Sequence, residues 1–451
     1  MSDAMICGTV IASMIVLIVM ITKFKVNAFL ALLICALGLA LVTGNGGAGS
    51  VNLVTSGFGA TMEDAGIIIV LGVIIGYLLE KTGGAEKIAS SVLRAVGEKR
   101  SILATCISGG IVSIPVFDDS GFLILYPAVK SLSRRGKIPL FSLVTALAIC
   151  LLATHCLVPP TPGPIAAAAI LGADLGLVIA YGLFVSVFAI TAVYLYTNSR
   201  YIKRKFPEYV TEDVAEEKQD EEEVFNEGVT DRSGYSTFAA YLPIVIPILL
   251  IVGNSVLGQL LPREHPVNEV FGFIGKPVIA LLMGIGVIWV MTRKYRTTVR
   301  MSWVEHAMDT TALVLLITAA GGAYGSVIRA SGIGDSISGI LAQTSIPSIC
   351  FPFVIALLVG TATGSATVSL TTTSAIVAPI LPSLGLSPEL AVIATASGAA
   401  GVVNVNASMF WLIHRVCKFD VKKTACCMSV GSIIMTVAAF FGTFVLSLFI
   451  S

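Results

Sequence analysis

Residues 139–171 read PLFSLVTALAICLLATHCLVPPTPGPIAAAAIL, and this stretch decides the fold class. It contains no Lys, Arg, Asp or Glu, and it exceeds the run of about 18 apolar residues that a bilayer crossing requires. The prolines between Pro159 and Pro164 must interrupt any helix, because proline lacks a backbone N–H and clashes with the preceding turn. The stretch is too long for one straight crossing and too short for two. It therefore predicts one membrane span that is broken near its middle.

The composition of the whole chain also predicts a polytopic membrane protein. Hydrophobic residues make up 56% of the 451 residues and charged residues only 12%, whereas a soluble domain carries about 25% charged residues. A soluble protein of this length could not bury so much apolar surface. The net charge of +1 gives no sign of a nucleic-acid partner. The nine cysteines show no CxxC pattern, which favours small packing residues.

Positive charges set the predicted orientation. The apolar run at residues 4–22 has no basic region before it and is followed by Lys23 and Lys25. We therefore expect an uncleaved first span whose N-terminus lies outside. About ten full spans then place both termini outside and nearly all basic residues in the cytoplasm. The exceptions on the outer side are Arg263, Lys276 and Arg329.

Interruptions within the apolar runs predict two further features of the first half. Residues 44–61 are rich in Gly, Ser and Asn and carry no charge, so we expect an external loop before a span at residues 65–79. Residues 101–132 are interrupted at Pro115 and at residues 118–121 and are flanked by positive charges at both ends. This pattern predicts a re-entrant hairpin that enters and leaves the membrane on the same side.

The second half repeats the order of the first. A span near residues 307–327 precedes a second hairpin at residues 346–383 and a second broken span at residues 388–414. Residues 80–88 (EKTGGAEKI) resemble residues 329–337 (RASGIGDSI). A chance match of glycines would not explain the shared order of span, hairpin and broken span.

In the predicted topology the two copies start on opposite sides of the membrane. This arrangement is an inverted repeat, as in secondary transporters that bind their substrate among broken helices at the repeat interface. The chain thus divides into a first repeat at residues 1–197, a charged cytoplasmic linker at residues 198–235 and a second repeat at residues 236–451. An acidic run at residues 216–223 marks the linker as a solvated connection.

The tip of the first hairpin reads IPVFDDSG at residues 114–121. A carboxylate deep in a membrane is costly without compensation, and the adjacent Asp118 and Asp119 disfavour each other's ionisation. Such a pair suits a proton carrier, whose charge must change with the side that it faces. The alternative is that an Asp caps the returning helix. We assign capping to one Asp and ion or substrate contact to the other, with Ser120 as a substrate contact.

His155 lies on the last turn before the proline-rich break. A single intramembrane His is often a satisfied hydrogen-bond partner between helices. Here it precedes a break whose freed backbone groups can line a cavity, which favours a role with substrate or proton. Within the break, Thr161 and Gly163 are expected to contact substrate.

The second hairpin has no charged residue between Asp335 and Glu389, but it has dense hydroxyls at residues 361–374. Ser and Thr alternate there with small or apolar residues, and a period of two favours an unwound segment. The alternative is that the hydroxyls bond back to helix carbonyls. Hydroxyls and helix N-termini suit a polyhydroxy or carboxylated ligand and could equally coordinate Na⁺. The expected substrate contacts of this half are Thr363, Gly364, Ser365, Thr367, Asn404 and Asn406.

Absent motifs narrow the choice of function. The sequence has no GxxxxGK[ST], no HExxH and no clustered His and Cys ligands, so ATP-driven transport and zinc chemistry lack support. A membrane-embedded enzyme is disfavoured because no nucleophile with its base is visible. We expect no cofactor besides the coupling ion.

At these motifs the chain resembles the gluconate:proton symporter (gluconate permease) family. The resemblance covers the chain from about residue 57 onward. It implies inner-membrane, proton-coupled uptake of sugar acids or related small hydroxy or amino acids, in a fold like that of other ion-coupled carboxylate transporters, which are often dimeric. The segments that carry it are GFGAT at 57–61, LEKTGGA at 79–85, IPVF at 114–117 with Asp119, His155 with PPTPGP at 159–164, and GSATV at 364–368.

The sequence departs from the family pattern at several positions. Asp118 stands where a second aromatic residue is usual, and Thr161 stands where His is common. Gly360 replaces a usual Arg, and residues 404–407, from Asn404 to Ala407, replace a His-x-Asn-Asp motif. A lost cation and a gained acid argue against gluconate itself and leave the transporter class intact.

We therefore expect an all-α membrane protein that carries a small hydroxylated organic acid, or a related zwitterion such as a D-amino acid, together with a proton. Substrate would bind between the two hairpin tips and the two helix breaks. Asp119 is the first choice for coupling, with Asp118 and His155 as its partners. A sodium-coupled carboxylate symporter or a cation/proton antiporter is the alternative, because paired buried carboxylates also suffice for these.

Overall fold

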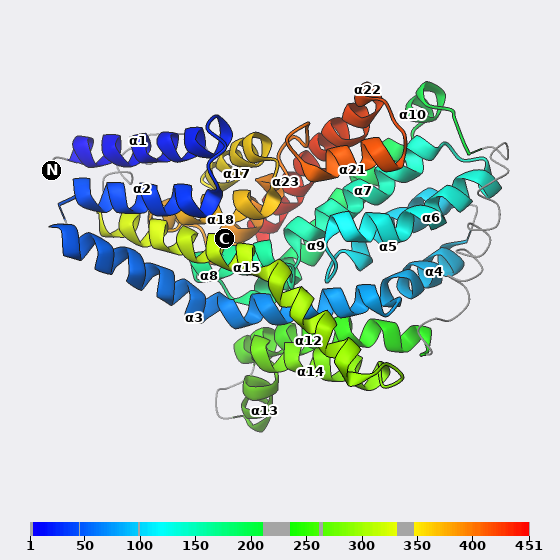
Figure 1. Ribbon diagram of the computed structural model, residues 1–451, viewed down its shortest axis with the longest axis horizontal. Coiled ribbons are helices and arrows are strands. Elements are labelled where there is room, and N and C mark those ends of the chain that lie inside the picture. The colour runs from blue at the N-terminus through cyan, green and yellow to red at the C-terminus, as the bar shows by residue number, and fades with distance from the viewer. Residues whose placement is uncertain are drawn as a thin grey trace.

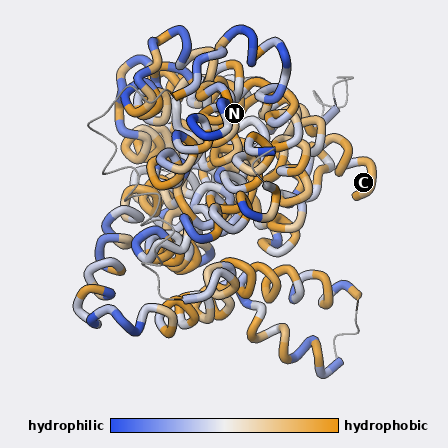
Figure 2. The backbone as a smooth tube through the Cα atoms, turned by 90° about the vertical axis from the view of Figure 1, so that its right-hand side faces the viewer, coloured by the Kyte–Doolittle hydropathy of each residue, from blue (hydrophilic) through white to orange (hydrophobic). Residues whose placement is uncertain are grey.

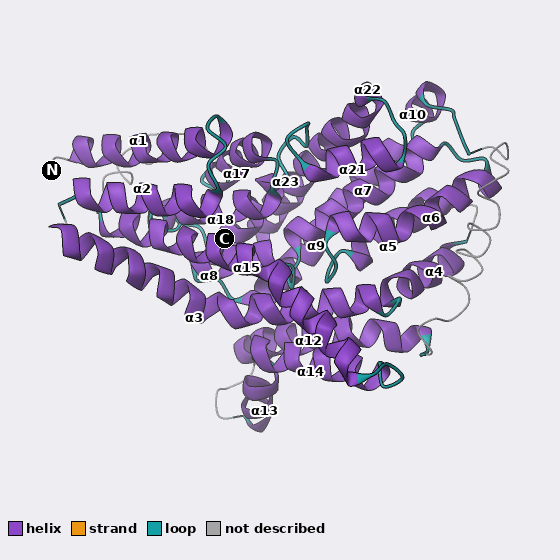
Figure 3. Cartoon of the chain, viewed as in Figure 1, coloured by secondary structure: helices purple, strands orange, loops and turns teal. Residues whose placement is uncertain are grey.

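The computed structural model describes residues 3–44, 46–97, 100–210, 235–260, 265–331 and 347–450. Within these residues the regular structure is helical and includes no strand (Figure 3). The predicted acidic run at 216–223, residues 332–337 of the internal match and the first residue of the second hairpin lie outside the described residues. The helices of the first half are α1 (Asp3–Thr22), α2 (Ala28–Val42), α3 (Gly46–Lys81), α4 (Gly84–Val96), α5 (Ser101–Val112), α6 (Asp118–Gly136), α7 (Leu140–Leu157), α8 (Pro162–Leu171), α9 (Leu175–Asn198) and α10 (Arg200–Lys205).

The second half is built in the same helical manner and ends in a helix that begins with a π-helical turn. Its elements are α12 (Thr237–Leu260), α13 (Pro266–Ile274), α14 (Pro277–Met291), α15 (Thr297–Ala330), α17 (Cys350–Thr363), α18 (Ala366–Val377), α19 (Leu381–Leu384), α20 (Pro388–Ala399), α21 (Ser408–Val416), α22 (Val421–Ala425), the π-helix η2 (Cys426–Val430) and α23 (Gly431–Ile450).

Apolar residues dominate the helices, and hydrophilic stretches gather mainly in loops and at helix ends (Figure 2). In the described part, six helical segments are long and apolar enough to cross a membrane, and the bent pair α13 and α14 makes a seventh if it is one span. Shorter apolar helices occur within α1, α2, α5, α17 and α18. The chain is therefore a multi-pass membrane protein, and the count of ten spans stays a prediction. The six segments are α3, residues 140–171 of α7 and α8, α9, α12, α15, and residues 421–450.

The longest described helices, α3 and α15, pack against each other (Figure 1). They comprise 36 and 34 residues. The ring of Tyr77, near the end of α3, lies 5.3 Å from the ring of His306, near the start of α15. At the other end of the pair, Gly57 lies against Ser326. The two helices are therefore antiparallel, and they join the two halves of the chain.

One sequence prediction is wrong along this helix pair. Residues 44–61 do not form an external loop, because α3 runs without interruption from Gly46. The span expected near residues 307–327 lies within α15, which extends it at both ends. A Cβ atom on Gly57 would lie 2.7 Å from the Cβ atom of Ser326. Glycines that suggested a loop thus serve the close approach of two helices, a tertiary contact that local sequence signals do not reveal.

The helices α7 and α20 form the most enclosed part of the core. Residues 141–157 of α7 and residues 390–399 of α20 are all buried. Both helices are apolar or small on every side, as expected for helices that other helices surround. Each leads directly into irregular backbone, so the core of each half ends at a break.

Four short segments interrupt the helices in this way. They are residues 113–117 between α5 and α6, 158–161 between α7 and α8, 364–365 between α17 and α18, and 400–407 between α20 and α21. We call them tip 1, break 1, tip 2 and break 2, in chain order. They fall within residues 101–132, 139–171, 346–383 and 388–414, where the sequence predicts the two hairpins and the two broken spans.

Candidate functional site

Asp118 and Asp119 open α6 directly after tip 1. Phe117 takes the N-cap position and makes no side-chain capping bond. Neither aspartate caps the helix, so the prediction that one of them does is wrong. Because the helix begins with Asp118, both carboxylates occupy its first turn, where the positive end of the helix dipole still favours an anion.

Asp118 faces His155 across tip 1 and break 1. The Nε2 atom of His155 lies 4.0 Å from Oδ1 of Asp118, which is an electrostatic contact longer than a hydrogen bond. The Phe117 ring lies 5.7 Å from the imidazole ring. His155 is buried, and among the described residues its Nδ1 atom has no hydrogen-bond partner. The structure thus brings together two of the three predicted coupling residues.

Asp119 points to the second half of the chain. Ser408, the first residue of α21, donates a hydrogen bond of 2.9 Å from Oγ to Oδ2 of Asp119. The other oxygen, Oδ1, is buried and has no hydrogen-bond partner among the described residues. A buried carboxylate oxygen without a donor is costly while the group is charged. Protonation or deprotonation of Asp119 therefore changes the free energy of the contact between the two halves of the chain.

Thr161 holds break 1 together from inside. Its hydroxyl lies 2.9 Å from the carbonyl oxygen of His155 and 2.8 Å from that of Val158, and it is placed to donate to both. These carbonyls lose their usual helical partners because the following prolines lack N–H groups. The observed hydrogen bonds give Thr161 a bracing function, and its predicted contact with substrate stays a prediction.

Break 1 also contacts the second hairpin. A Cβ atom on Gly163 would lie 2.7 Å from Cδ1 of Leu370 and 3.6 Å from Cα of Thr367. The start of α8 therefore lies against the start of α18. The hydroxyl of Thr367 is half-buried and has no hydrogen-bond partner among the described residues, which makes it the best-placed hydroxyl for a ligand.

Four of the other hydroxyls at residues 361–374 donate to helix carbonyls, whereas those of Thr372, Thr373 and Ser374 are buried without a partner among the described residues. Thr361 donates to the carbonyl of Leu357 at 2.7 Å, and Thr363 donates to that of Val359 at 2.8 Å. The predicted unwound piece is present but short, because only residues 364–365 leave the helical conformation between α17 and α18. Ser365 accepts a capping bond from the backbone N–H of Val368 at 3.4 Å.

Tip 2 closes onto break 2. Gly364 has a φ of +69°, and a Cβ atom there would lie 2.6 Å from the carbonyl carbon of Asn406, so glycine is required by both conformation and space. The side-chain amide of Asn404 donates to the carbonyl of Thr361 at 3.2 Å, and its Oδ1 accepts from the backbone N–H of Asn406 at 2.9 Å. Asn404 thus fixes the break, whereas the side chain of Asn406 is exposed and makes one long bond of 3.4 Å to the carbonyl of Ala362.

Together these contacts close a ring of helix ends around the four irregular segments. The start of α6, after tip 1, meets the end of α7, before break 1, through Asp118 and His155, and the start of α8 meets the start of α18 at Gly163. Tip 2 meets break 2 at Gly364, and α21, which follows break 2, returns to α6 through the bond from Ser408 to Asp119. Exposed backbone groups, hydroxyls and two carboxylates therefore converge from both halves, an arrangement suited to binding a small polar molecule and an ion.

Sequence reasoning missed two serines that stabilise break 2, Ser429 in η2 and Ser432 in α23. Ser429 donates to the carbonyl of Val403 at 2.6 Å, and Ser432 accepts from the backbone N–H of the same residue at 3.0 Å. The π-helix η2 contains Ser429. No local signal marks these serines. Ser408 could have been found, because it directly follows the asparagine-rich break.

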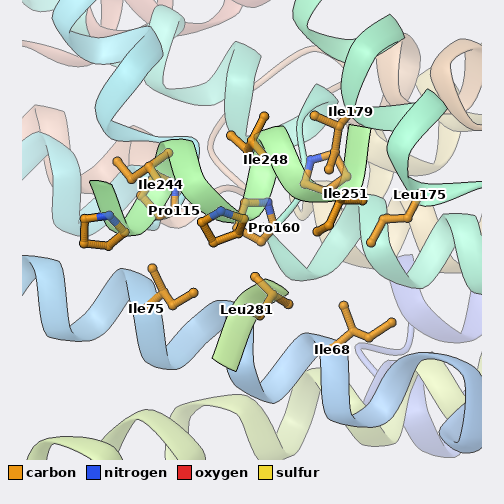
Figure 4. Close-up of a pocket in the computed structure, with 13 residues that line it drawn as sticks. Ile68, Ile75, Pro115, Pro160, Leu175, Ile179, Ile244, Ile248, Ile251 and Leu281 are labelled. Carbon is orange, nitrogen blue, oxygen red and sulfur yellow. The ribbon is translucent and has the colours of Figure 1, made fainter. Parts of the chain in front are cut away.

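An apolar crevice lies behind tip 1 and break 1 (Figure 4). It is lined by Pro115, Pro159 and Pro160 and by isoleucines, leucines and prolines of α3, α9, α12 and α14, including Ile75 and Leu281. None of its lining residues belongs to the predicted site. Its lining is apolar, so it does not suit a polar substrate.

Comparison with known proteins gives matches over almost the whole chain. The family model described as "GntP family permease" matches residues 5–449. The chain is 31% identical to the D-serine transporter DsdX of Escherichia coli (strain K12), covering 100% of both chains. It is 32% identical to a gluconate permease of Pseudomonas aeruginosa, covering 94% of this chain and 93% of the other. It is 31% identical to the inner membrane permease YgbN of Escherichia coli (strain K12), covering 92% of each.

Among solved structures, the YdaH transporter of Alcanivorax borkumensis has a similar fold. The TM-score is 0.66, and the match covers 93% of this chain and 98% of the other at 16% sequence identity. At such identity the match bears on the fold alone. The arrangement of helices described above is therefore shared with that protein.

Proposed function

Because the chain belongs to the GntP family of permeases, we propose that it is a proton-coupled symporter that takes up a small hydroxylated organic acid or a related hydroxy or amino acid. The family consists of permeases, so the chain is a transporter and not an enzyme. Relatives named for gluconate and for D-serine support this range of substrates. A relative named as an inner membrane permease supports placement in the cytoplasmic membrane.

The observation that carries the proposal is the position of Asp119 in the ring. One carboxylate oxygen accepts from Ser408 of the other half, and the second oxygen is buried without a donor. In the charged form that second oxygen destabilises the closed ring, and protonation removes the cost. Proton loading at Asp119 would then favour a closed ring around the substrate. Release of the proton on the other side would favour opening.

The architecture that we propose around this site is an inverted repeat. The pair α5 and α6 followed by α7 and α8 has the same order as the pair α17 and α18 followed by α20 and α21. We propose that both pairs derive from repeats at residues 1–197 and 236–451, that tips 1 and 2 belong to re-entrant hairpins, and that both chain termini lie outside. A homodimer is the assembly that the family resemblance implies.

Sodium coupling is the second candidate. Two neighbouring carboxylates and nearby hydroxyls supply the oxygen ligands that Na⁺ also uses. The described residues contain no group of three His, Cys, Asp or Glu side chains placed around a metal ion, but Na⁺ sites are often built from carbonyls and hydroxyls. The choice between the two ions is a matter for transport measurements.

The proposal is tested with purified protein in liposomes whose interior is more alkaline than the medium. Gluconate, D-glycerate and D-serine are offered in turn, and both solute accumulation and internal pH are followed. We expect accumulation of at least one solute with solute-dependent acidification of the interior, no need for sodium, and loss of accumulation on adding a protonophore. Accumulation driven by a sodium gradient without proton movement would favour the second candidate and contradict the first.

The variant Asp119→Asn tests the assigned carrier. It keeps the shape and a hydrogen-bond acceptor for Ser408 but cannot change its charge. We expect it to lose accumulation against a gradient and to retain exchange of solute between equal pools. The matched control is Asp64→Asn, because Asp64 is an exposed carboxylate on α3 outside the ring. Wild-type accumulation by the Asp119→Asn protein would exclude Asp119 as the carrier.

A further inference from the structure

Asp118 differs from Asp119 in having no hydrogen-bond donor at all among the described residues. Its side chain remains 17% exposed, and its oxygens are absent from the buried atoms that lack partners. The Nε2 atom of His155 lies 4.0 Å from Oδ1 of Asp118. An accessible carboxylate in the first turn of α6, with no donor bound to it, is an acceptor left open for a cationic group.

The elements that form the ring carry no compensating Lys or Arg near it. The sequence has none between Arg100 and Lys130, which covers tip 1, and none between Lys137 and Arg200, which covers break 1. There is none between Arg329 and Arg415, which covers tip 2 and break 2. A plain hydroxy acid would thus bring a third carboxylate beside two existing ones, and like charges repel strongly where water is scarce.

We propose that Asp118 binds the ammonium group of the substrate, so that this transporter selects a small zwitterionic hydroxy amino acid over the corresponding hydroxy acid. This inference rests on the proposed function, because it assumes that the ring binds the transported solute. The ammonium group offers three donors to Asp118 and to the hydroxyl of Ser120, which has no partner among the described residues. The free hydroxyl of Thr367, on the other side of the ring, is available to the substrate's carboxylate. Asp119 keeps the proton-carrying function, so the two neighbouring carboxylates have separate tasks.

The test compares two solutes that differ at a single group. D-serine and D-glycerate share one three-carbon skeleton, with an ammonium group in the first where the second has a hydroxyl. Each is measured as a competitor of labelled D-serine uptake, and in direct uptake, using the full-length protein in liposomes. We expect wild-type protein to prefer D-serine by roughly tenfold or more, the ratio that corresponds to one hydrogen bond between charged groups.

The variant Asp118→Asn should abolish this selectivity. We expect its apparent affinity for D-serine to fall by roughly tenfold or more, while that for D-glycerate stays the same or rises because one negative charge is gone. Asp118→Glu keeps the charge and should keep the preference for D-serine. Matched elution of the purified variants on size exclusion establishes that they are folded.

Several outcomes would overturn the inference. An equal loss of affinity for both solutes in Asp118→Asn would show that Asp118 does not bind the ammonium group. A wild-type preference for D-glycerate would show the same. Loss of a sodium dependence in the same variant would assign Asp118 to an inorganic cation instead. If a variant fails to fold, the competition of D-serine and D-glycerate for uptake by the wild-type protein tests the inference alone. Uptake of D-glycerate with a proton and no uptake of D-serine would leave the proposed function intact and reject only the inference, whereas uptake of neither solute nor of gluconate would reject both.

Discussion

Ser365 and Thr367 stand two residues apart in tip 2 and α18, yet their hydroxyls have different partners. Ser365 caps α18, whereas the hydroxyl of Thr367 is free among the described residues and lies near Gly163 of the other half. We expect Thr367→Ala to weaken substrate binding by about 0.5–1.5 kcal/mol, the value of one neutral hydrogen bond. Ser365→Ala should instead lower the thermal stability, by about 1 kcal/mol.

Binding and thermal unfolding of both purified variants separate these two effects. Apparent affinity is obtained from competition in liposomes, and stability from thermal unfolding in detergent. Unchanged affinity in Thr367→Ala would move the substrate away from α18. Each variant is the matched control for the other, because each removes one hydroxyl at the start of α18.

The sequence could name many of these residues but could not assign their partners. Asp119 and His155 attract attention because ionisable groups are rare in apolar runs. The bond from Ser408 to Asp119 joins residues that lie far apart in the chain, so no local pattern contains it. Asn404 and Thr161 looked like ligand contacts, but their observed bonds hold the backbone of the breaks.

At the scale of helices, α3 provides the surface on which tip 1 and break 1 rest. Gly72 and Gly76 lie one turn apart on this helix. A Cβ atom at Gly76 would overlap the carbonyl of Pro115 and lie 2.8 Å from its carbonyl carbon, and one at Gly72 would lie 3.1 Å from Cβ of Pro160. The two turns that carry Asp118 and His155 are therefore positioned by the absence of side chains on one face of α3.

This contact predicts an unusual response to a small substitution. Ala is favoured over Gly in a helix interior by about 0.5–1 kcal/mol, so Gly59→Ala, on the open face of α3 with nothing within 4 Å of its Cβ position, should be neutral or stabilising. Gly76→Ala should instead displace tip 1, because the carbonyl of Pro115 belongs to the backbone and cannot rotate away. We expect lower thermal stability and lost uptake in Gly76→Ala only. Wild-type uptake by this variant would show that the position of tip 1 does not depend on its close contact with Gly76 of α3.

Prediction of the elements from sequence succeeded where the signal was local and failed where it was tertiary. Proline placed breaks in the chain correctly at residues 113–117 and 158–161, because it acts on the backbone where it stands, whereas residues 118–121, which also suggested an interruption, begin α6. The glycines of residues 44–61 have no such local meaning. They read as loop residues until the neighbouring helix α15 is known.

At the scale of the whole molecule, the start of the linker fastens the two halves to each other. The backbone carbonyl of Glu208 accepts from the N–H of Leu140 at the start of α7. Its side chain accepts from Nζ of Lys423 in α22 at 2.8 Å. The ring of Phe206 stacks on that of Phe141 with centroids 4.0 Å apart. Residues 206–210 thus connect the start of the first broken span to α22 of the second half.

The ion pair between Glu208 and Lys423 has a defined dependence on pH. The hydrogen bond and charge of Lys423 lower the pKa of Glu208 below its ordinary value. The pair's contribution to stability is therefore fully present above the ordinary carboxyl pKa of about 4.3 and is lost as the pH falls through the lowered value. Because the side chain of Glu208 is 65% exposed, the contribution should stay below about 1 kcal/mol and decrease with salt.

The measurement is the difference in thermal unfolding midpoint between wild-type protein and Glu208→Gln. We expect a small lowering of the midpoint at pH 7 in low salt, and the difference should shrink toward zero as the pH falls into the acid range. Glu63→Gln, on the exposed side of α3, is the matched control and should show no such convergence. A constant difference at every pH would mean that the Glu208 side chain acts through packing. The connection between the halves at this place would then rest on packing, such as the stacked rings of Phe141 and Phe419, whose centroids lie 6.1 Å apart.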